Sequence, residues 1–201
     1  MSTIPLNLET DTVVLAPPAL PMGYALEQAL KNRHSTRSFR SDALSLETLS
    51  SLLWAGFGIN RSDTGQRTAP SAHNWQEIEV FAVLPEGAYR YEAKGHRLLL
   101  VKAEDLRGAT GSQDFVATAP LNLVYVADFA RMPESTPEER GFFAGADAGF
   151  IAQNVYLYCA AAGLATVVRG LIDRSRLAAA LGLRKTERIA LAQTVGFPAA
   201  G

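Results

Sequence analysis

The feature that most constrains the fold of this sequence is an uncharged stretch from Ala148 to Val168. A run of roughly 20 such residues is long enough to cross a lipid bilayer. The stretch nevertheless contains Gln153 and Asn154, and no basic flank precedes it. We therefore expect a long buried helix, over about 140–162, that runs into a buried strand at 165–168.

Apolar periodicity places further elements along the chain. Leu26, Ala29 and Leu30 recur at helical spacing and predict the buried face of a helix over 24–32. The polar segment 59–72 is predicted to be a loop. The remaining predicted elements are helices at 45–58 and 175–181 and strands at 77–84, 89–91, 97–101, 120–127 and 189–195. Because helices and strands mix without strict strand–helix–strand alternation, we expect an α+β fold.

The long helix is expected to serve two kinds of contact. Its inner face is predicted to hold Phe143, Ala146, Phe150, Val155 and Tyr158. Five aromatic residues surround more of the helix than the core of one subunit should need, namely Phe142, Phe143, Phe150, Tyr156 and Tyr158. This distribution predicts that the helix also forms a homodimer interface.

Length and composition indicate one globular domain. The chain has 201 residues, of which 48% are hydrophobic and 19% charged, and this excludes a disordered or fibrous protein. We expect a single domain over 23–201, preceded by an extended arm over 1–22 that is rich in proline. The net charge is −1, which argues against general binding to nucleic acid or to anionic membranes.

The sequence also predicts where the protein works. Its single cysteine, Cys159, cannot form an intramolecular disulfide, which suits a reducing compartment. The first residues lack the basic and apolar pattern of a signal peptide. We therefore expect a cytoplasmic protein.

Common catalytic signatures are absent from the sequence. The segment 56–61 begins like a dinucleotide-binding fingerprint, but it has Arg61 where the third glycine belongs and follows a predicted helix. His34, His73 and His96 have no partner at the spacing of metal ligands, so no metal site is expected. No side chain is expected to be a catalytic base or nucleophile. If the protein is an enzyme, its reactive group arrives with a cofactor.

Two guanidinium groups flank a hydroxyl in the sequence RHSTR, at 33–37. In extended backbone, Arg33, Ser35 and Arg37 project to one side. This set of donors suits a phosphate or the pyrimidine edge of a flavin. A basic cap at the end of the first helix explains the same residues equally well.

A second candidate is PSAHNWQ, at 70–76, which ends the predicted loop. Ser71 and Asn74 provide donors and acceptors that suit a heterocycle or a ribityl chain. Taken alone, a turn with a local side-chain hydrogen bond is the simpler explanation.

Together these motifs resemble the FMN-dependent nitroreductase family. That family has an R-x-S-x-R stretch near its N-terminus and a P-S-x-x-N-x-Q stretch further along. The helix sequence DAGFIAQN at 147–154 and the final Gly196-Phe197-Pro198 also fit. The sequence of 52–55 and of 67–71 is similar to the branch that includes azoline-oxidising dehydrogenases of peptide natural products. The similarity covers nearly the whole chain from Tyr24 onward.

The resemblance implies a three-layer α+β sandwich and an obligate homodimer with two FMN sites at its interface. In such proteins the R-x-S-x-R stretch contacts phosphate, ribityl chain and pyrimidine, and the P-S-x-x-N stretch reaches the flavin from the partner subunit. The strand after the long helix presents backbone N–H groups to the flavin ring. The residues that carry over are Arg33, His34, Ser35, Arg37, Pro70, Ser71, Ala72, Asn74, Val168, Arg169 and Gly170, with Gln113 at the pyrimidine edge.

Two departures from the family pattern change these expectations. Many relatives hold the phosphate with basic residues after the last strand, whereas 197–201 contains none. Phosphate is then expected to depend on Arg33 and Arg37, with Arg67 as a further donor. The frequent Pro-Trp after the motif glutamine is also missing, and Glu77 follows Gln76 instead.

The resemblance implies an oxidoreductase in which hydride passes from NADH or NADPH through flavin N5 to a nitroaromatic, quinone or similar acceptor. Arg37 would be the electrostatic partner of the reduced flavin. Two alternatives stay open: dehydrogenation of a peptide azoline, and a flavin-binding sensor or carrier without turnover.

Overall fold

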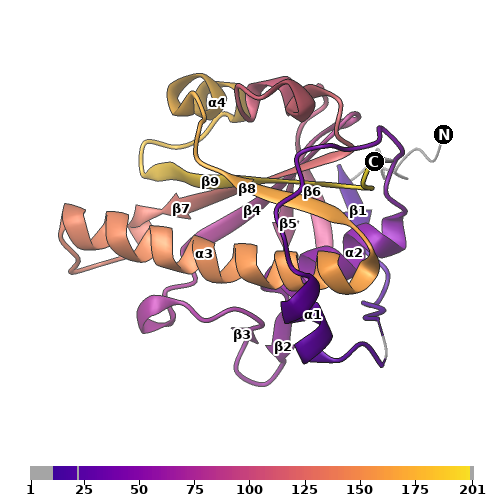
Figure 1. Ribbon diagram of the computed structural model, residues 1–201. Helices are drawn as coiled ribbons and strands as arrows, with labels where there is room; N and C mark the ends of the chain where they lie inside the picture. Colours follow the sequence, from indigo (N-terminus) through magenta and orange to yellow (C-terminus); the bar gives the residue numbers. More distant parts are fainter. Residues whose placement is uncertain (1–10, 22, 200–201) are drawn as a thin grey trace.

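A seven-stranded sheet forms the middle layer of the protein (Figure 1). The computed structural model describes residues 11–21 and 23–199. The strand order is β1-β6-β5-β4-β7-β9-β8, and all neighbouring strands are antiparallel. The strands are β1 (Thr12–Val14), β4 (Ile78–Leu84), β5 (Gly87–Glu92), β6 (Arg97–Lys102), β7 (Leu121–Asp128), β8 (Ala165–Arg169) and β9 (Glu187–Gly196). The sheet and its flanking helices confirm the predicted α+β fold.

Helices cover both faces of this sheet, which makes three layers. One face carries α1 (Leu26–Asn32), α2 (Leu46–Phe57) and α3 (Pro137–Ala162), and α4 (Arg174–Leu181) lies on the other (Figure 1). Short 3-10 turns, η2 (Arg107–Ala109) and η3 (Asp114–Ala117), accompany α4. The central strands β4 and β7 are buried along their whole length because both of their faces are covered.

The expected N-terminal arm contributes a strand to the sheet. Its residues Thr12–Val14 pair with β6 and form one edge of the sheet. Residues 1–10 and 22 of that arm lie outside the described residues. The predicted loop 59–72 also contains structure, a small hairpin of β2 (Ile59–Arg61) and β3 (Gln66–Arg67). Within the described parts of the chain, no helix is long and apolar enough to span a membrane.

The long helix α3 begins earlier than the predicted Arg140. Thr136 is its N-cap, and the Thr136 hydroxyl accepts a hydrogen bond from the backbone of Glu139. The Glu139 carboxylate in turn accepts from Thr136 N at 2.8 Å, which completes a capping box, and Pro137 occupies the first helical position. Gly163 ends the helix in the left-handed conformation (φ 68°).

The inner face of α3 differs from the predicted one. Val155 and Tyr158 are buried as expected, but Phe150 is 48% exposed. Tyr156, expected among the interface aromatics, is buried, and so is Tyr158. Phe143 and Ala146 are half-buried. The reason is that α3 packs against α1 and α2 as well as β8 and β9, so its buried stripe is broader than a sheet alone would make it.

The predicted buried face of α1 is wrong at two of its three positions. Ala29 is buried, whereas Leu26 and Leu30 are 64% and 55% exposed. The helix contacts α3 through a narrow strip and leaves its leucines outside. These leucines are therefore an exposed apolar surface within one subunit.

Candidate functional site

The Tyr156 hydroxyl joins three separate elements of the fold. Its Oη accepts a hydrogen bond from Val168 N of β8 at 2.9 Å. The same oxygen lies 2.8 Å from Ser35 Oγ, in the segment that follows α1. The guanidinium carbon of Arg33 lies 5.3 Å from the centre of the Tyr156 ring. Arg33, Ser35 and Val168, predicted from separate motifs, thus meet around a residue of α3.

The segment 33–40 runs in extended conformation along this edge of the molecule. Thr36 N donates to Thr166 O of β8 at 3.0 Å, and Arg40 N donates to Phe197 O at 3.0 Å. Phe39 also bridges to Pro198. This backbone pairing fixes the course of the segment, in which Arg33, Thr36 and Phe39 are the half-buried residues.

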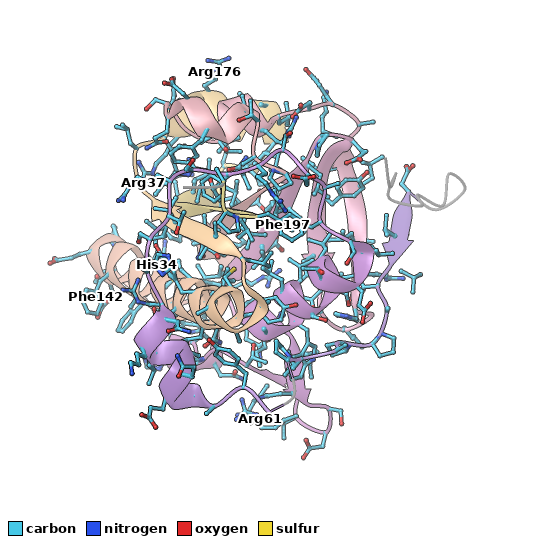
Figure 2. All side chains as sticks on the ribbon, turned by 45° about the vertical axis from the view of Figure 1, so that its right-hand side comes forward. His34, Arg37, Arg61, Phe142, Arg176 and Phe197 are labelled. Atoms are coloured by element: carbon cyan, nitrogen blue, oxygen red, sulfur yellow. The ribbon has the colours of Figure 1, made fainter. Side chains whose placement is uncertain are left out.

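Arg33 and Arg37 of this segment have no acidic partners among the described residues, whereas Arg40 pairs with Asp42. Arg33 is half-buried and Arg37 is exposed, and neither forms an ion pair with the residues that the structure describes. Figure 2 shows Arg37 projecting outward from the segment, with His34 nearer to α3. The His34 Nδ1 lies 2.7 Å from Asn32 O. The segment therefore presents two unpaired guanidinium groups to an anion.

Arg169 places a buried cation at the end of β8, on the sheet face opposite to Val168. Its guanidinium donates to Thr110 O at 2.8 Å, Asn122 Oδ1 at 2.9 Å and Thr194 Oγ1 at 3.0 Å. Burial away from any carboxylate lowers its pKa to about 10. These neutral acceptors fix the strand end without cancelling the positive charge.

Two predicted residues lie beside this arginine. Gln113 Oε1 is 3.4 Å from Nη1 of Arg169, so the structure brings Gln113 to the end of β8. The next residue, Gly170, is exposed, and its carbonyl accepts from Arg174 Nη1 at 3.3 Å. Both residues therefore border the surface at which the strand ends.

The loop 70–76 docks on the other half of α3. Ala72 N donates to Asp147 Oδ2 at 2.9 Å, and Ser71 Oγ accepts from Gln76 N at 3.0 Å. Asn74 Oδ1 accepts from the Gln76 side chain at 3.1 Å. Pro70 and Asn74 are exposed at the rim of the loop. The predicted polar groups of this loop thus form part of their hydrogen bonds within the loop itself.

One chain holds the predicted site in two halves. Asp147, which anchors the loop, and Tyr156, which holds the Arg33 segment, are nine positions apart on α3. At a rise of 1.5 Å per residue, that separation is about 13 Å along the helix. The structure therefore does not bring Ser71 to Ser35 within one chain.

Arg67 lies with the loop half. Its Nε donates to Gln76 Oε1 at 2.8 Å, its Nη1 donates to Phe57 O at 3.0 Å, and its guanidinium stacks on the Phe57 ring at 4.3 Å. Burial lowers its pKa. The side chain also lines a cavity of about 360 Å³ with Arg90 and Arg131. Two of its donor groups are therefore already used inside the subunit.

Tyr156 is the site residue that sequence reasoning missed. The sequence places it on α3 among other aromatic residues, where an interface role is the natural expectation. Its position directly below β8 depends on how α3 crosses the sheet, and no local pattern encodes that crossing. Among the described residues, no group of histidine, cysteine and acidic side chains could hold a metal ion.

Comparison with known proteins agrees with this arrangement. The Nitroreductase family model matches residues 30–197. The nitroreductase-like protein MJ1384 of Methanocaldococcus jannaschii is 33% identical over 156 residues, which are 72% of this chain and 78% of that protein. A crystal structure of a nitroreductase-like protein from Ralstonia eutropha JMP134 matches with a TM-score of 0.91 and 46% identity, over 97% of this chain and 93% of that one.

A more distant structure shares the fold. The NADPH:FMN oxidoreductase from Vibrio harveyi, complexed with NAD+, has a TM-score of 0.65 and 19% identity, over 87% of this chain and 69% of that one. The family match and these relatives support an oxidoreductase. The chain belongs to the nitroreductase family.

Proposed function

We propose that this protein is an FMN-dependent oxidoreductase that uses NADH or NADPH to reduce a nitroaromatic, quinone or similar acceptor. The observation that carries the proposal is the segment 33–37, whose unpaired Arg33 and Arg37 flank a serine bonded to Tyr156. A dianionic phosphate and an electron-rich pyrimidine edge both need this kind of donor.

The chemistry of the donor set fits FMN. Arg33 would bind the phosphate, and Ser35 would bind the phosphate or the ribityl chain. Arg37 would lie beside the pyrimidine, while Gln113 and the backbone at Gly170 would border the ring. The Tyr156 hydroxyl already holds Val168 N–H, so we include Tyr156 with the residues that fix this wall of the site.

A second copy of the chain completes the site in this proposal. The loop residues Ser71 and Asn74 lie too far along α3 to reach the Arg33 segment of their own chain. Exposed apolar side chains occur on the helices between the two halves, namely Leu26, Leu30, Phe142 and Phe150, with Leu171 beyond β8. Burying them against a partner would bring the partner's loop to the cofactor.

The protein's own contribution is mainly electrostatic. Bound FMN would supply the redox chemistry, because it accepts a hydride from a nicotinamide and gives it up to an acceptor. The Arg37 charge stabilises negative charge on the pyrimidine, and Arg169 adds a fixed positive charge behind β8. This function does not require a side-chain base, in keeping with the sequence.

The proposal is tested first by cofactor binding. The purified apoprotein is titrated with FMN, and the loaded protein is then mixed anaerobically with NADH and with NADPH. Because a charged hydrogen bond contributes on the order of 1.5–3 kcal/mol, Arg33→Ala should weaken FMN binding by roughly ten- to a hundredfold. Arg176→Ala is the matched control, since Arg176 is exposed on α4 (Figure 2). Equal affinity of Arg33→Ala and wild type would refute the phosphate assignment.

The anaerobic mixing separates the remaining alternatives. Rapid bleaching of the flavin by either nucleotide supports the proposed oxidoreductase. FMN binding without reduction would favour a sensor or carrier, or a dehydrogenase that takes its electrons from a peptide azoline. Incubation of the oxidised protein with an azoline-containing peptide then decides between these two.

A further inference from the structure

Glu77 is a buried acid whose carboxyl group receives no hydrogen bond from the rest of the described chain. The residue is completely buried immediately before β4. Neither of its carboxyl oxygens receives a hydrogen bond from an N–H or hydroxyl group of another described residue, and the backbone N–H of Glu77 itself is the donor that acts on the group. A buried carboxyl group without partners is costly, and it calls for a specific explanation.

Asp147 on α3 is the group that faces Glu77. It is also buried, and its carboxylate already accepts the Ala72 N–H of the loop 70–76. The carboxyl groups of Glu77 and Asp147 lie within hydrogen-bonding range of each other. Two carboxylates offer only acceptors, so a hydrogen bond between them exists only when one of them carries a proton.

The neighbouring charges do not neutralise a doubly ionised pair. Arg131 is the cation that acts on Glu77, but its Nη1 donates to Gln76 O at 3.0 Å and its Nη2 to Glu79 Oε1 at 2.6 Å. The Asp128 N–H from β7 binds the Glu77 carbonyl rather than its carboxyl group, and the Asp128 carboxylate is paired with Arg184. Two negative charges would therefore face each other in a buried site.

The loop above this pair needs an anchor. His73, Asn74 and Gln76 all adopt positive φ angles of 50°, 55° and 48°. Such angles are unfavourable for residues with side chains, so the loop keeps them only if surrounding contacts impose them. The Ala72–Asp147 hydrogen bond ties the loop to α3. The rings of His73 and Trp75 add contacts with Phe143 of α3, with ring centres 6.2 and 5.8 Å apart.

We propose that Glu77 and Asp147 share one proton, and that this proton holds the loop 70–76 against α3 until the pair becomes doubly ionised. Asp147 then acts as the anionic acceptor for Ala72, while Glu77 acts as the proton donor that keeps Asp147 in place. Both are positioning residues. Release of the proton brings two like charges together and loosens the loop. Only the consequence for FMN rests on the proposed function.

The shared proton is tested directly by infrared spectroscopy. A protonated carboxyl group has a C=O stretch that ionised carboxylates lack. We expect this band in the apoprotein at pH 6, where exposed acids are ionised, and its loss in Glu77→Gln. Absence of the band from the wild type at this pH would overturn the proposal.

The anchoring role is tested by hydrogen exchange at the Ala72 amide between pH 6 and 9. After correction for intrinsic exchange, wild-type protection should fall as the proton is lost, by up to about tenfold per pH unit, the limit for one proton. Gln at position 77 keeps a donor for Asp147 but does not titrate. In Glu77→Gln the corrected protection should therefore stay constant with pH, and a fall equal to that of wild type would also overturn the proposal.

Two controls separate this effect from other titrations. His73 is the histidine of the same loop, so its replacement in His73→Asn, by a residue that tolerates positive φ, should keep the wild-type dependence of Ala72 protection on pH. Glu187 is another buried acid, on β9 and paired with Arg184. Glu187→Gln should also keep the wild-type dependence of Ala72 protection on pH. Loss of the dependence in His73→Asn would assign the effect to the imidazole and refute our assignment.

A last measurement links the pair to the cofactor while keeping the two proposals distinct. If the loop of one subunit contacts FMN in the other, wild-type FMN affinity should fall above pH 7 and that of Glu77→Gln should not. If neither protein binds FMN but the infrared and exchange results hold, the proposed function fails and the shared proton stands. If both bind FMN with the same pH dependence, the loop's role at the cofactor is refuted.

Discussion

Arg37 shows how one exposed side chain could set a redox property. Its positive charge has no acidic partner among the described residues. A cation beside a flavin pyrimidine stabilises the reduced, anionic ring more than the neutral oxidised one. We therefore expect the Arg37 charge to raise the midpoint potential of bound FMN and the rate at which FMN is reduced.

Replacing Arg37 with glutamine removes the charge and keeps hydrogen-bond donors. We expect Arg37→Gln to bind FMN less tightly, to have a midpoint potential lower by on the order of 20–60 mV, and to be reduced more slowly. Potentiometric titration and stopped-flow reduction of FMN-saturated protein measure both. Arg40→Gln is the control, because Arg40 lies on the same segment but pairs with Asp42. Equal potentials for Arg37→Gln and wild type would make Arg37 a surface residue only.

The Glu77 carboxyl group gives the folded state a distinct dependence on pH. Burial, reinforced by Asp147, raises the pKa of Glu77 from 4.5 to about 7. Between these two pH values the folded protein holds a proton that the unfolded chain releases. The contribution of Glu77 to the free energy of unfolding is therefore greatest below pH 4.5 and falls as pH rises toward 7. The loss should be on the order of 1–3 kcal/mol.

Urea unfolding of wild type and Glu77→Gln at pH 5, 6, 7 and 8 checks this dependence. The free energy of unfolding of wild type should decline across the series relative to that of Glu77→Gln. The variant should therefore be the more stable protein at pH 8. Parallel curves for the two proteins would show that Glu77 has an ordinary pKa.

At the scale of elements, one hydroxyl connects α3, β8 and the segment after α1. Tyr156→Phe removes this hydroxyl and leaves Val168 N and Ser35 without their shared partner. Because each such hydrogen bond contributes about 0.5–1.5 kcal/mol, we expect FMN affinity to fall roughly three- to tenfold with the fold intact. Isothermal titration measures the affinity. Tyr158→Phe, which removes a hydroxyl that contacts Ser51 and Thr48 O of α2 rather than the Arg33 segment, should bind FMN with an affinity close to that of wild type.

The elements themselves were largely predictable from sequence, and their faces less so. Strand patterns at 77–84 and 120–127 match β4 and β7 because strands buried on both sides are continuously apolar. The start of α3 was predicted too late, at Arg140, although Thr136 and Glu139 have capping-box spacing around Pro137. The exposure of Leu26 and Phe150 was not predictable, because apolar periodicity does not distinguish a core from an interface.

The candidate site also has a part that the sequence predicts and a part that depends on the fold. The motif at 33–37 identifies donors from residue type alone, but the backbone that carries them is held by a long-range pairing of Thr36 with Thr166. Tyr156 and the Glu77–Asp147 pair depend on contacts between residues far apart in the chain. Sequence spacing therefore supplied the chemical groups, whereas the crossing of α3 under the sheet determined which of them meet.

At the scale of the whole molecule, the exposed apolar residues on α1 and α3 predict a dimer. Light scattering should give about twice the subunit mass of 21.6 kDa. Phe150→Glu places a charge on this surface at a position that is 48% exposed, so it should yield monomers that lose FMN while remaining folded. Val14→Glu is the control, on the opposite sheet edge at 72% exposure. A wild-type monomer that retains FMN would contradict both the interface and the shared site.

The 13 Å between the two halves of the site along α3 has a genetic consequence if the proposed dimer forms. An allele damaged at Arg33 and another damaged in the loop 70–76 would each give inactive homodimers. In a mixed dimer, one site collects both lesions and the other collects none. Random pairing of equal amounts would then restore about a quarter of the sites. Two null alleles in one cell would complement each other, whereas two alleles altered in the same half would not.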